Sequence, residues 1–434
     1  MPTHIPVKLG DILLSLSEIA DIANPSLAFH QQRTAYIALS TARSAGTDDK
    51  SLEDIFTAAL LHDIGALTLE DKITLHNSEA VETDSHCING QFLLQSIPWF
   101  GNVPKIVRHH HTDWSRLNAS INEPAVFAAQ VIYLADHIER LIERNKYILH
   151  QKNDILDNVR KLSSDMFHPD VVKCFIEASM PDSFWLDIMS PGLNSLLMKF
   201  GTYKHIEIGM EDVSIISNLY KAIIDYKSPF TATHSSGVSA CSEMLSKLCG
   251  FSDADILQMK IAGDLHDIGK MTILNSILEK PGKLNQEELE IMRSHTYYTY
   301  YILNTVNGMQ QIAKWAAYHH EKLDGSGYPF AYTADQLDTG SRIVAVADIF
   351  TAVSEDRPYR PGMPKDSVYR LLKGKADSGQ LDKKIIEALY DNYNEVYAYV
   401  RSKQSQGRTF YNTHIRSQSE VLFGSLIPGA TGTF

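Results

Sequence analysis

The sequence predicts an all-α fold built as two tandem helical bundle domains. Along most of the chain, apolar residues recur with the 3.6-residue period of core-facing helices, whereas alternating strand patterns are scarce. A series of histidine and aspartate landmarks also occurs twice in the same order, which indicates one structural unit used twice. At 434 residues the chain is long enough for two domains that each bury a core.

Composition and charge narrow the class of protein. Hydrophobic residues make up 44% of the chain and charged residues 21%, as is typical of soluble globular proteins. A net charge of −12 argues against broad binding to polymeric nucleic acid or to anionic membrane. The four cysteines form no CxxC pair, the start resembles no signal peptide, and no apolar run approaches the roughly 18 residues of a membrane span. We therefore expect a cytoplasmic protein.

Three segments show the helical signal clearly. The segment "SLEDIFTAALLHDIG" carries the apolar stripe of a core-facing helix, and "DADILQMKIAGDLHDIG" carries a similar one. In "LNQEELEIMRSH", Asn285 is followed three residues later by Glu288, which predicts a capping box at a helix start. The stripe of the first segment consists of Leu52, Ile55, Phe56, Ala59 and Leu60.

The internal repeat is the most informative feature of the sequence. His30 precedes His62 by 32 residues, and His234 precedes His266 by the same 32. A later histidine precedes a histidine pair by 24 residues in both copies: His86 with His110-His111, and His295 with His319-His320. "VIYLADHIERLI" then matches "RIVAVADIFTAV". Landmarks that recur in order at identical spacing predict two copies of one fold.

The repeat also sets the expected domain boundaries. We expect a first domain over residues 1–190, a linker over 191–205, a second domain over 206–402 and a tail over 403–434. The stretch between the copies contains two prolines and two glycines, and periodicity is lost after about residue 402. A short docking element is expected around Val421 to Ile427.

The second copy contains a full set of metal-ligand residue types. A single histidine is usually solvated or a satisfied core residue, but seven such residues on helical segments favour a metal site. Imidazole with carboxylate suits Fe, Mn or Zn rather than Mg. Seven ligands exceed what one ion with an open water position needs, so they predict two ions that share a carboxylate. The candidates are His234, His266, Asp267, His295, His319, His320 and Asp348.

The motifs "HDIGK", "HHEKLDGSGYP" and "VADIFTAVSEDRPYR" together resemble the HD-GYP family over roughly residues 210 to 400. The resemblance implies two tandem HD-type helical bundles, the first a degenerate, regulatory HD domain and the second a catalytic HD-GYP domain. It implies hydrolysis of a cyclic dinucleotide, cyclic di-GMP or 3′,3′-cyclic GMP-AMP, to a linear 5′-phosphorylated dinucleotide. A tandem subclass with this domain order includes cyclic GMP-AMP phosphodiesterases.

The resemblance also assigns roles to the ligands. It implies two divalent ions, iron or manganese, that activate a hydroxide for attack on phosphorus. Asp267 and the hydroxide are expected to bridge the ions. The first ion is expected to be held by His234, His266, Asp267 and Asp348, and the second by His295, His319 and His320.

Five further residues are candidates for contact with the substrate. Lys270 is expected on the scissile phosphate, and Arg357 and Arg360 match family positions that grip phosphate. Asp324 is expected to orient a ligand histidine or to shape its loop, with a simple turn-capping role as the alternative. Tyr328 is available for substrate or partner contact, although packing alone explains it equally well.

Some family members place a glutamate four residues before the first histidine, where it supports a third metal. This chain has Phe230 at that position, and phenylalanine cannot ligate a metal. The sequence therefore favours a dinuclear centre over a trinuclear one.

The first copy keeps the ligand types but lacks the residues that handle phosphate. Its candidates are His30, His62, Asp63, His86, His110, His111 and Asp136. Ala66 stands where Lys270 does, and Asn145 and Ile148 stand where the two arginines do. A non-hydrolytic regulatory or dimerising role is favoured, and a metal-bound ligand sensor or a second hydrolase remains open.

Two other functions compete with the phosphodiesterase. One is a non-catalytic receptor that detects a cyclic dinucleotide and relays it to a protein partner, but it has no need of an activated water. The other is a general phosphohydrolase of mononucleotides, against which the Gly-Tyr-Pro loop and the arginine pair argue. A homodimer, and a signalling protein that docks on this loop, are further expectations.

Overall fold

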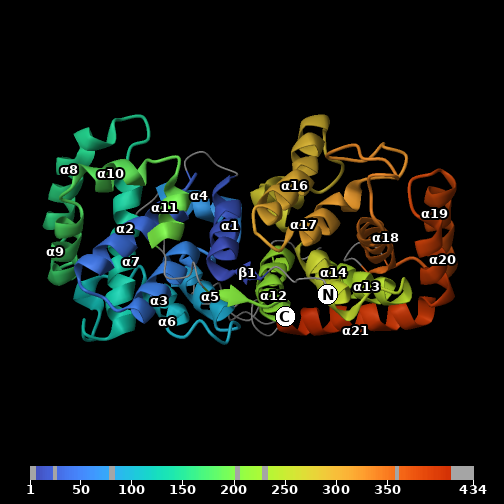
Figure 1. The fold of residues 1–434 in the computed structure, drawn as a ribbon, viewed down its shortest axis with the longest axis horizontal. Coiled ribbons are helices and arrows are strands. Elements are labelled where there is room, and N and C mark those ends of the chain that lie inside the picture. The colour runs from blue at the N-terminus through green and yellow to red at the C-terminus, as the bar shows by residue number, and fades with distance from the viewer. Residues whose placement is uncertain are drawn as a thin grey trace, which may run out of the picture. The chain divides into compact units, whose positions relative to one another are not determined.

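A computed structural model of the chain describes residues 6–22, 27–77, 84–200, 206–226, 233–356 and 361–411. The chain divides into two compact units, Met1–Ile208 and Gly209–Phe434, called here the first unit and the second unit. The predicted all-α class is confirmed, because helices dominate the described residues of both units (Figure 1). The strands among the described residues are β1 (Val7–Lys8) and β2 (Glu207–Ile208), a short antiparallel pair.

In the first unit, α2 lies at the centre of the bundle and packs against α3, α7 and α9. The unit consists of α1 (Leu9–Ile22), α2 (His30–Ser44), α3 (Asp49–Leu61), α4 (Leu69–Asn77), α5 (Asp84–Leu94), α6 (Val103–His109), η1 (Trp114–Arg116), α7 (Pro124–Leu141), α8 (Ile148–Lys161), α9 (Pro169–Ala178), α10 (Asp182–Ile188) and α11 (Leu193–Phe200), with β1 and β2.

In the second unit, α13 takes the central position and packs against α14, α18 and α21 (Figure 1). The unit consists of α12 (Met210–Tyr226), α13 (His234–Leu248), α14 (Asp253–Leu265), η3 (Ile268–Thr272), α15 (Asn275–Leu278), α16 (Gln286–Asn304), α17 (Gln310–Ala317), η4 (Tyr318–His320), α18 (Thr339–Ser354), α19 (Lys365–Asp377), α20 (Lys383–Asp391) and α21 (Tyr393–Tyr411).

The helices correspond in chain order between the units. α2 and α13 each begin at the first repeated histidine, and α3 and α14 each end just before the repeated His-Asp pair. α5 and α16 carry the next histidine, and α7 and α18 carry the last aspartate. Each candidate ligand therefore comes from the same part of the bundle in both units.

Local sequence explains where several of these helices begin. The predicted capping box is confirmed at α16, where Asn285 and Glu288 each accept a hydrogen bond from the other's backbone N–H. Asp48 caps α3 and Ser252 caps α14 through their side chains. All five members of the predicted apolar stripe in α3 are buried. A helix that begins at a fixed cap and packs along a fixed stripe delivers its last residues to a fixed place in the core.

The structure differs from the expected segments at two places. Within the predicted linker, α11 forms and packs against α2, because Leu193 and Leu197 are buried one turn apart. Helix α21 continues to Tyr411, beyond the expected start of the tail, since its packing against α13 extends the second unit. The docking element expected around Val421 to Ile427 lies outside the described residues.

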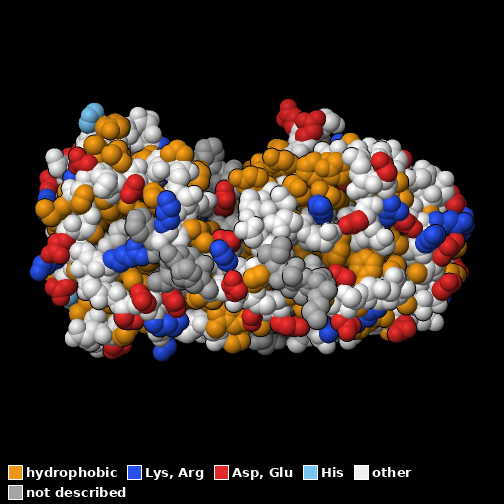
Figure 2. All heavy atoms as spheres, viewed as in Figure 1, with side chains coloured by type: hydrophobic (Ala, Val, Ile, Leu, Met, Phe, Trp, Pro, Cys, Tyr) orange, Lys and Arg blue, Asp and Glu red, His pale blue; other side chains and the backbone are white. Residues whose placement is uncertain are grey.

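Two features of the helices concern hydrophobicity: their length and hydropathy relative to a membrane span, and the hydrophobic side chains exposed at the surface. Among the described residues, no helix is long and apolar enough to cross a membrane. Hydrophobic side chains gather over α16 of the second unit (Figure 2), where Ile291, Tyr297 and Tyr301 are exposed.

Candidate metal centre

A close backbone contact fixes the His-Asp-Ile-Gly turn of the second unit. A Cβ atom at Gly269 would lie 1.9 Å from the carbonyl oxygen of His295 in α16, so the turn can approach this helix only with glycine. Thr299 ties the two together, because its hydroxyl accepts from the Gly269 N–H at 3.1 Å and donates to the His266 carbonyl at 3.1 Å. The turn thus brings the ligand candidates of α14 and α16 face to face.

Asp267 lies at the centre of the resulting cluster. Its Oδ2 is 3.1 Å from Nε2 of His266. Its Oδ1 is 3.3 Å from Nε2 of His295 and 3.9 Å from Nε2 of His319. These four side chains are buried.

Asp348 of α18 forms the other side of the cluster. Its Oδ1 is 3.1 Å from Nε2 of His234, and its Oδ2 is 3.9 Å from Nδ1 of His320. Ligand atoms of His234, His266 and Asp348 lie within 4.8 Å of one another, as do those of His295, His319 and His320. The structure therefore brings together all seven residues that the sequence singled out.

The imidazole rings are oriented from behind by the backbone. Nδ1 of His266, His295 and His319 each faces a carbonyl oxygen three residues earlier, at 2.8, 2.6 and 2.7 Å. A proton on Nδ1 leaves the lone pair on Nε2, which faces the cluster. Backbone acceptors of this kind orient the histidine ligands of many metal sites.

Two buried atoms show that the cluster fits cations. Nε2 of His266 and Oδ1 of Asp267 have no hydrogen-bond partner among the described residues. A buried lone pair or carboxylate oxygen without a partner is costly, and a bound cation removes that cost. The donor set of imidazole nitrogens and carboxylate oxygens suits divalent transition ions.

The electrostatics keep three of the histidines neutral. Burial lowers the pKa of His295 to about 3, and the charge of Lys270 acts in the same direction. Burial also lowers the pKa of His319 and of His320. Burial opposes the charge on Asp267, but the neighbouring His266 and Lys270 outweigh it and hold the pKa of this carboxyl well below its usual range. Neutral imidazole and ionised carboxylate are the forms that bind metal.

Lys270 reaches the cluster from the 3₁₀ turn η3. Its Nζ lies 2.6 Å from Oδ2 of Asp267, and its side chain is 21% exposed. A positive charge thus lies against the central carboxylate and remains partly open to solvent. Ala66, the residue at the matching position of the first unit, offers no such charge.

A buried glutamate, which the sequence analysis did not single out, holds the backbone of the loop that contains Gly-Tyr-Pro. Glu321 is buried and accepts hydrogen bonds from the backbone N–H groups of Phe330 at 2.7 Å and Tyr332 at 3.0 Å. The position of Glu321 directly after the histidine pair is the one feature of the sequence that could have indicated this role. Asp324 accepts from the N–H and hydroxyl of Ser326 at 2.9 and 2.7 Å, contacts that shape the loop.

Tyr328 connects this loop to the cluster. Its ring centroid lies 4.9 Å from that of His320, and its N–H donates to the His320 carbonyl at 3.2 Å. On α16, the exposed Arg293 places its guanidinium 5.2 Å from the centre of the Tyr328 ring. Arg293 is a second residue that the sequence analysis missed, because nothing local indicates that its helix face meets the loop.

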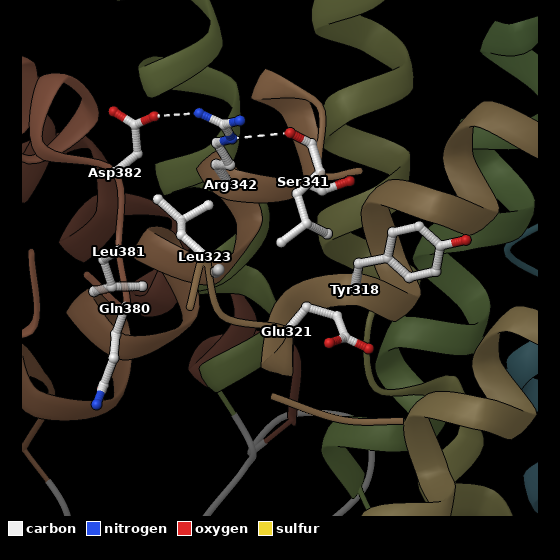
Figure 3. Close-up of a pocket in the computed structure, with 10 residues that line it drawn as sticks. Tyr318, Glu321, Leu323, Ser341, Arg342, Gln380, Leu381 and Asp382 are labelled. Atoms are coloured by element: carbon white, nitrogen blue, oxygen red, sulfur yellow. Dashed lines mark hydrogen bonds and ion pairs between the residues drawn. The ribbon is translucent and has the colours of Figure 1, made fainter. Parts of the chain in front are cut away.

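A small pocket lies behind the same loop (Figure 3). Arg342 and Asp382 pair along one side at 2.8 Å, and Tyr318 and Glu321 lie on the other. Arg342 also donates to the Leu337 carbonyl at 2.9 Å. None of the described residues that line this pocket is a candidate metal ligand.

Three predicted positions lie outside the described residues: Phe230, Arg357 and Arg360. The expectations about a third metal and about the arginine grip on phosphate stay predictions.

The first unit assembles a comparable cluster. Ligand atoms of Asp63, His86, His110 and His111 lie within 4.8 Å of one another, and those of His30, His62 and Asp63 do so as well. The retained ligand types of the first copy are therefore brought together in space and not only in sequence.

Comparison with known proteins agrees with this duplicated architecture. A model of the HD domain matches residues 27–141, and a second HD-domain model matches residues 218–385. A 3′3′-cGAMP-specific phosphodiesterase of Vibrio cholerae is 30% identical over 401 residues, which are 90% of this chain and 93% of that protein. The chain belongs to the HD-GYP family.

Two further proteins are similar to part of the chain or to its whole fold. A cyclic di-GMP phosphodiesterase response regulator of Xanthomonas campestris is 33% identical over 186 residues, or 42% of this chain and 48% of that protein. A crystal structure of a cyclic GMP-AMP specific phosphodiesterase from Vibrio cholerae aligns with a TM-score of 0.64 at 21% identity, covering 90% of this chain and 98% of that one. This last likeness shows that the tandem HD fold is shared.

Proposed function

We propose that the second unit hydrolyses a phosphodiester bond of a cyclic dinucleotide, 3′3′-cyclic GMP-AMP or cyclic di-GMP or both, to a linear 5′-phosphorylated dinucleotide. The observation that carries this proposal is the convergence of seven metal-ligand side chains, Asp267 among them, with Lys270 against the Asp267 carboxylate. The nearly full-length relative named as a cyclic GMP-AMP phosphodiesterase supports the substrate class.

The proposed ligand roles follow the two sides of the cluster. Asp267 would be shared by the two ions that we propose, and iron or manganese suits the mixed donor set. Such ions supply a water of lowered pKa and neutralise charge on the phosphate. One ion would be held by His234, His266, Asp267 and Asp348, and the other by His295, His319, His320 and the shared carboxylate.

In the proposed reaction, the oxygen of water bonds to phosphorus while the bond from phosphorus to the 3′-oxygen breaks. The leaving 3′-oxygen takes up a proton, so the product carries a 3′-hydroxyl and a 5′-phosphate. Lys270 neutralises charge that builds on the non-bridging oxygens. Arg357 and Arg360 grip the phosphates, and Tyr328 contacts the substrate beside His320.

The first unit is proposed to regulate the second rather than to hydrolyse a substrate. Ala66 replaces the lysine, and "HHHTDWSRLNAS" has none of the glycines of the loop in the second unit. A dimer formed through the first unit, and a signalling protein that docks on the loop around Tyr328, complete the proposal.

The test uses the full chain loaded with Fe²⁺ or Mn²⁺ and incubated with each cyclic dinucleotide separately, followed by chromatography of the products. We expect a linear product from at least one of them. Asp267→Asn should lower turnover by more than about 10³-fold, beyond the loss of a single electrostatic donor. Asp377→Asn changes an exposed carboxylate of α19 and serves as the matched control, with unchanged turnover. Tight binding without any product would support the receptor alternative and contradict hydrolysis.

A further inference from the structure

The first unit carries a cluster of donors that the proposed hydrolysis does not use. Asp63 lies at its centre, with Oδ1 3.5 Å from Nε2 of His86 and 3.9 Å from Nε2 of His110. The Nε2 atoms of these two histidines are 3.2 Å apart. His111 completes the group, because the ligand atoms of all four side chains lie within 4.8 Å of one another.

The rings of this cluster are oriented as in the second unit. Nδ1 of His110 faces the Val107 carbonyl at 2.6 Å, and Nδ1 of His62 faces the Ala59 carbonyl at 2.8 Å. Both contacts leave Nε2 to face Asp63. Nε2 of His62 is also fully buried and has no hydrogen-bond partner among the described residues, but it belongs to the end of the cluster that includes His30.

The other end of the cluster, at Asp136 and Glu139, differs from the second unit. Arginines already neutralise the negative charge of these two carboxylates. Arg140 lies one turn after Asp136 in α7 and places Nη2 3.0 Å from its Oδ2. Glu139 contacts both Arg33 and Arg144. A divalent ion at this end would meet guanidinium charge at close range.

His30 belongs to the compensated end. Its Nδ1 lies 2.6 Å from Glu139, and its Nε2 lies 3.4 Å from Asp136 and 3.5 Å from Asp63. Both ring nitrogens therefore face carboxylates. In the second unit the residues that correspond to Glu139 and Arg140 are Thr351 and Ala352, which carry no charge.

We propose that the first unit binds a single divalent transition ion through Asp63, His86, His110 and His111, and that this ion stabilises the unit without reacting. Three imidazoles and one carboxylate form the closed four-ligand shell of a structural site, and zinc is the ion that suits it. A closed shell leaves no position for a reactive water. The arginine-compensated end excludes the second ion that the second unit is proposed to hold.

The experiment measures metal content of the full chain in which both proposed ion positions of the second unit are disabled by His234→Ala, His266→Ala, His295→Ala and His319→Ala. After incubation with zinc and removal of free ion, we expect about one ion per chain by mass spectrometry. Adding His86→Ala and His110→Ala should abolish this ion and lower the melting temperature. Adding His150→Ala instead changes an exposed histidine and should leave the ion in place. No ion in the parent variant, or an ion that persists without His86 and His110, would overturn the site.

Two further measurements test the geometry and the number of ions. Cobalt(II) in the same protein should give the visible absorption of a tetrahedral site, and His110→Gln, which keeps the side-chain volume, should remove it. Arg140→Ala should raise the zinc content of the parent variant from about one to about two ions per chain. Two ions before this change would overturn the single-ion assignment, and one ion after it would overturn the role of the arginine.

Discussion

The first unit and the second unit share the His-Asp-Ile-Gly turn for the same steric reason. A Cβ atom would lie 2.0 Å from the His86 carbonyl at Gly65 and 1.9 Å from the His295 carbonyl at Gly269. The glycine is therefore required wherever the turn must meet the next histidine helix. The repeated motif preserves this packing, whether or not the unit carries out chemistry.

The charged residues around the shared turn differ between the units. In the second unit a lysine contacts the central aspartate, and in the first unit Ala66 holds that place while Arg140 contacts Asp136. Positive charge thus lies against different carboxylates in the two clusters. The comparison teaches that the ligand set follows the repeated fold, whereas the cations beside it distinguish the two clusters.

The largest effect is expected from removing the lysine that distinguishes the units. Lys270→Ala should raise the barrier by about 2–4 kcal/mol, a loss of roughly 30- to 1,000-fold in turnover, with metal content unchanged. The reciprocal change Ala66→Lys should add no turnover, because the charge of Arg140 remains. Lys247→Ala alters an exposed lysine of α13 and is the control. Full turnover in Lys270→Ala, measured with metal-loaded protein, would contradict the assigned role.

A smaller effect should follow when the glycine of either turn is filled. Gly65→Ala and Gly269→Ala each force a Cβ into a carbonyl oxygen, and we expect each to lower the free energy of unfolding by about 1–3 kcal/mol. Only Gly269→Ala should also lower turnover. Gly374→Ala is the matched control, because a Cβ there meets nothing within 4 Å and should stabilise α19 by up to about 1 kcal/mol. Thermal unfolding that treats all three variants alike would refute the steric explanation.

Spacing in the sequence indicated the ligand clusters because the His-Asp pairs follow helices with fixed caps, and the other ligands lie at matching places on the helices and turns of each bundle. The two His-Asp pairs directly follow α3 and α14, and their rings then converge on the histidines of α5 and α16. Sequence spacing could not predict contacts between residues of different helices and loops. The support of the loop by Glu321 and the stacking of Arg293 on Tyr328 depend on how the chain turns back after η4.

The arginines of the first unit show a different limit of prediction from the sequence. Asn145 and Ile148 stand at the positions that match the arginine pair of the second unit. Arg140 lies nearer, one turn beyond Asp136 on the same helix face, where residues four apart are neighbours. That signal was present in the sequence, but its meaning depends on Asp136 being buried. The same applies to α11, whose leucine spacing was visible within the expected linker.

The smallest effect should come from changing Glu321, which supports the loop of the second unit and stands where the first unit has Thr112. Glu321→Gln keeps the shape and one acceptor but removes the charge that holds the N–H groups of Phe330 and Tyr332, a loss of about 1 kcal/mol. Because the loop positions Tyr328 and not the ligands, KM should rise about fivefold with metal content unchanged. Glu290→Gln, an exposed change in α16, is the control. A loss of metal in Glu321→Gln would instead show that this glutamate supports the histidine pair. The residue that follows the histidine pair of the first unit is Thr112.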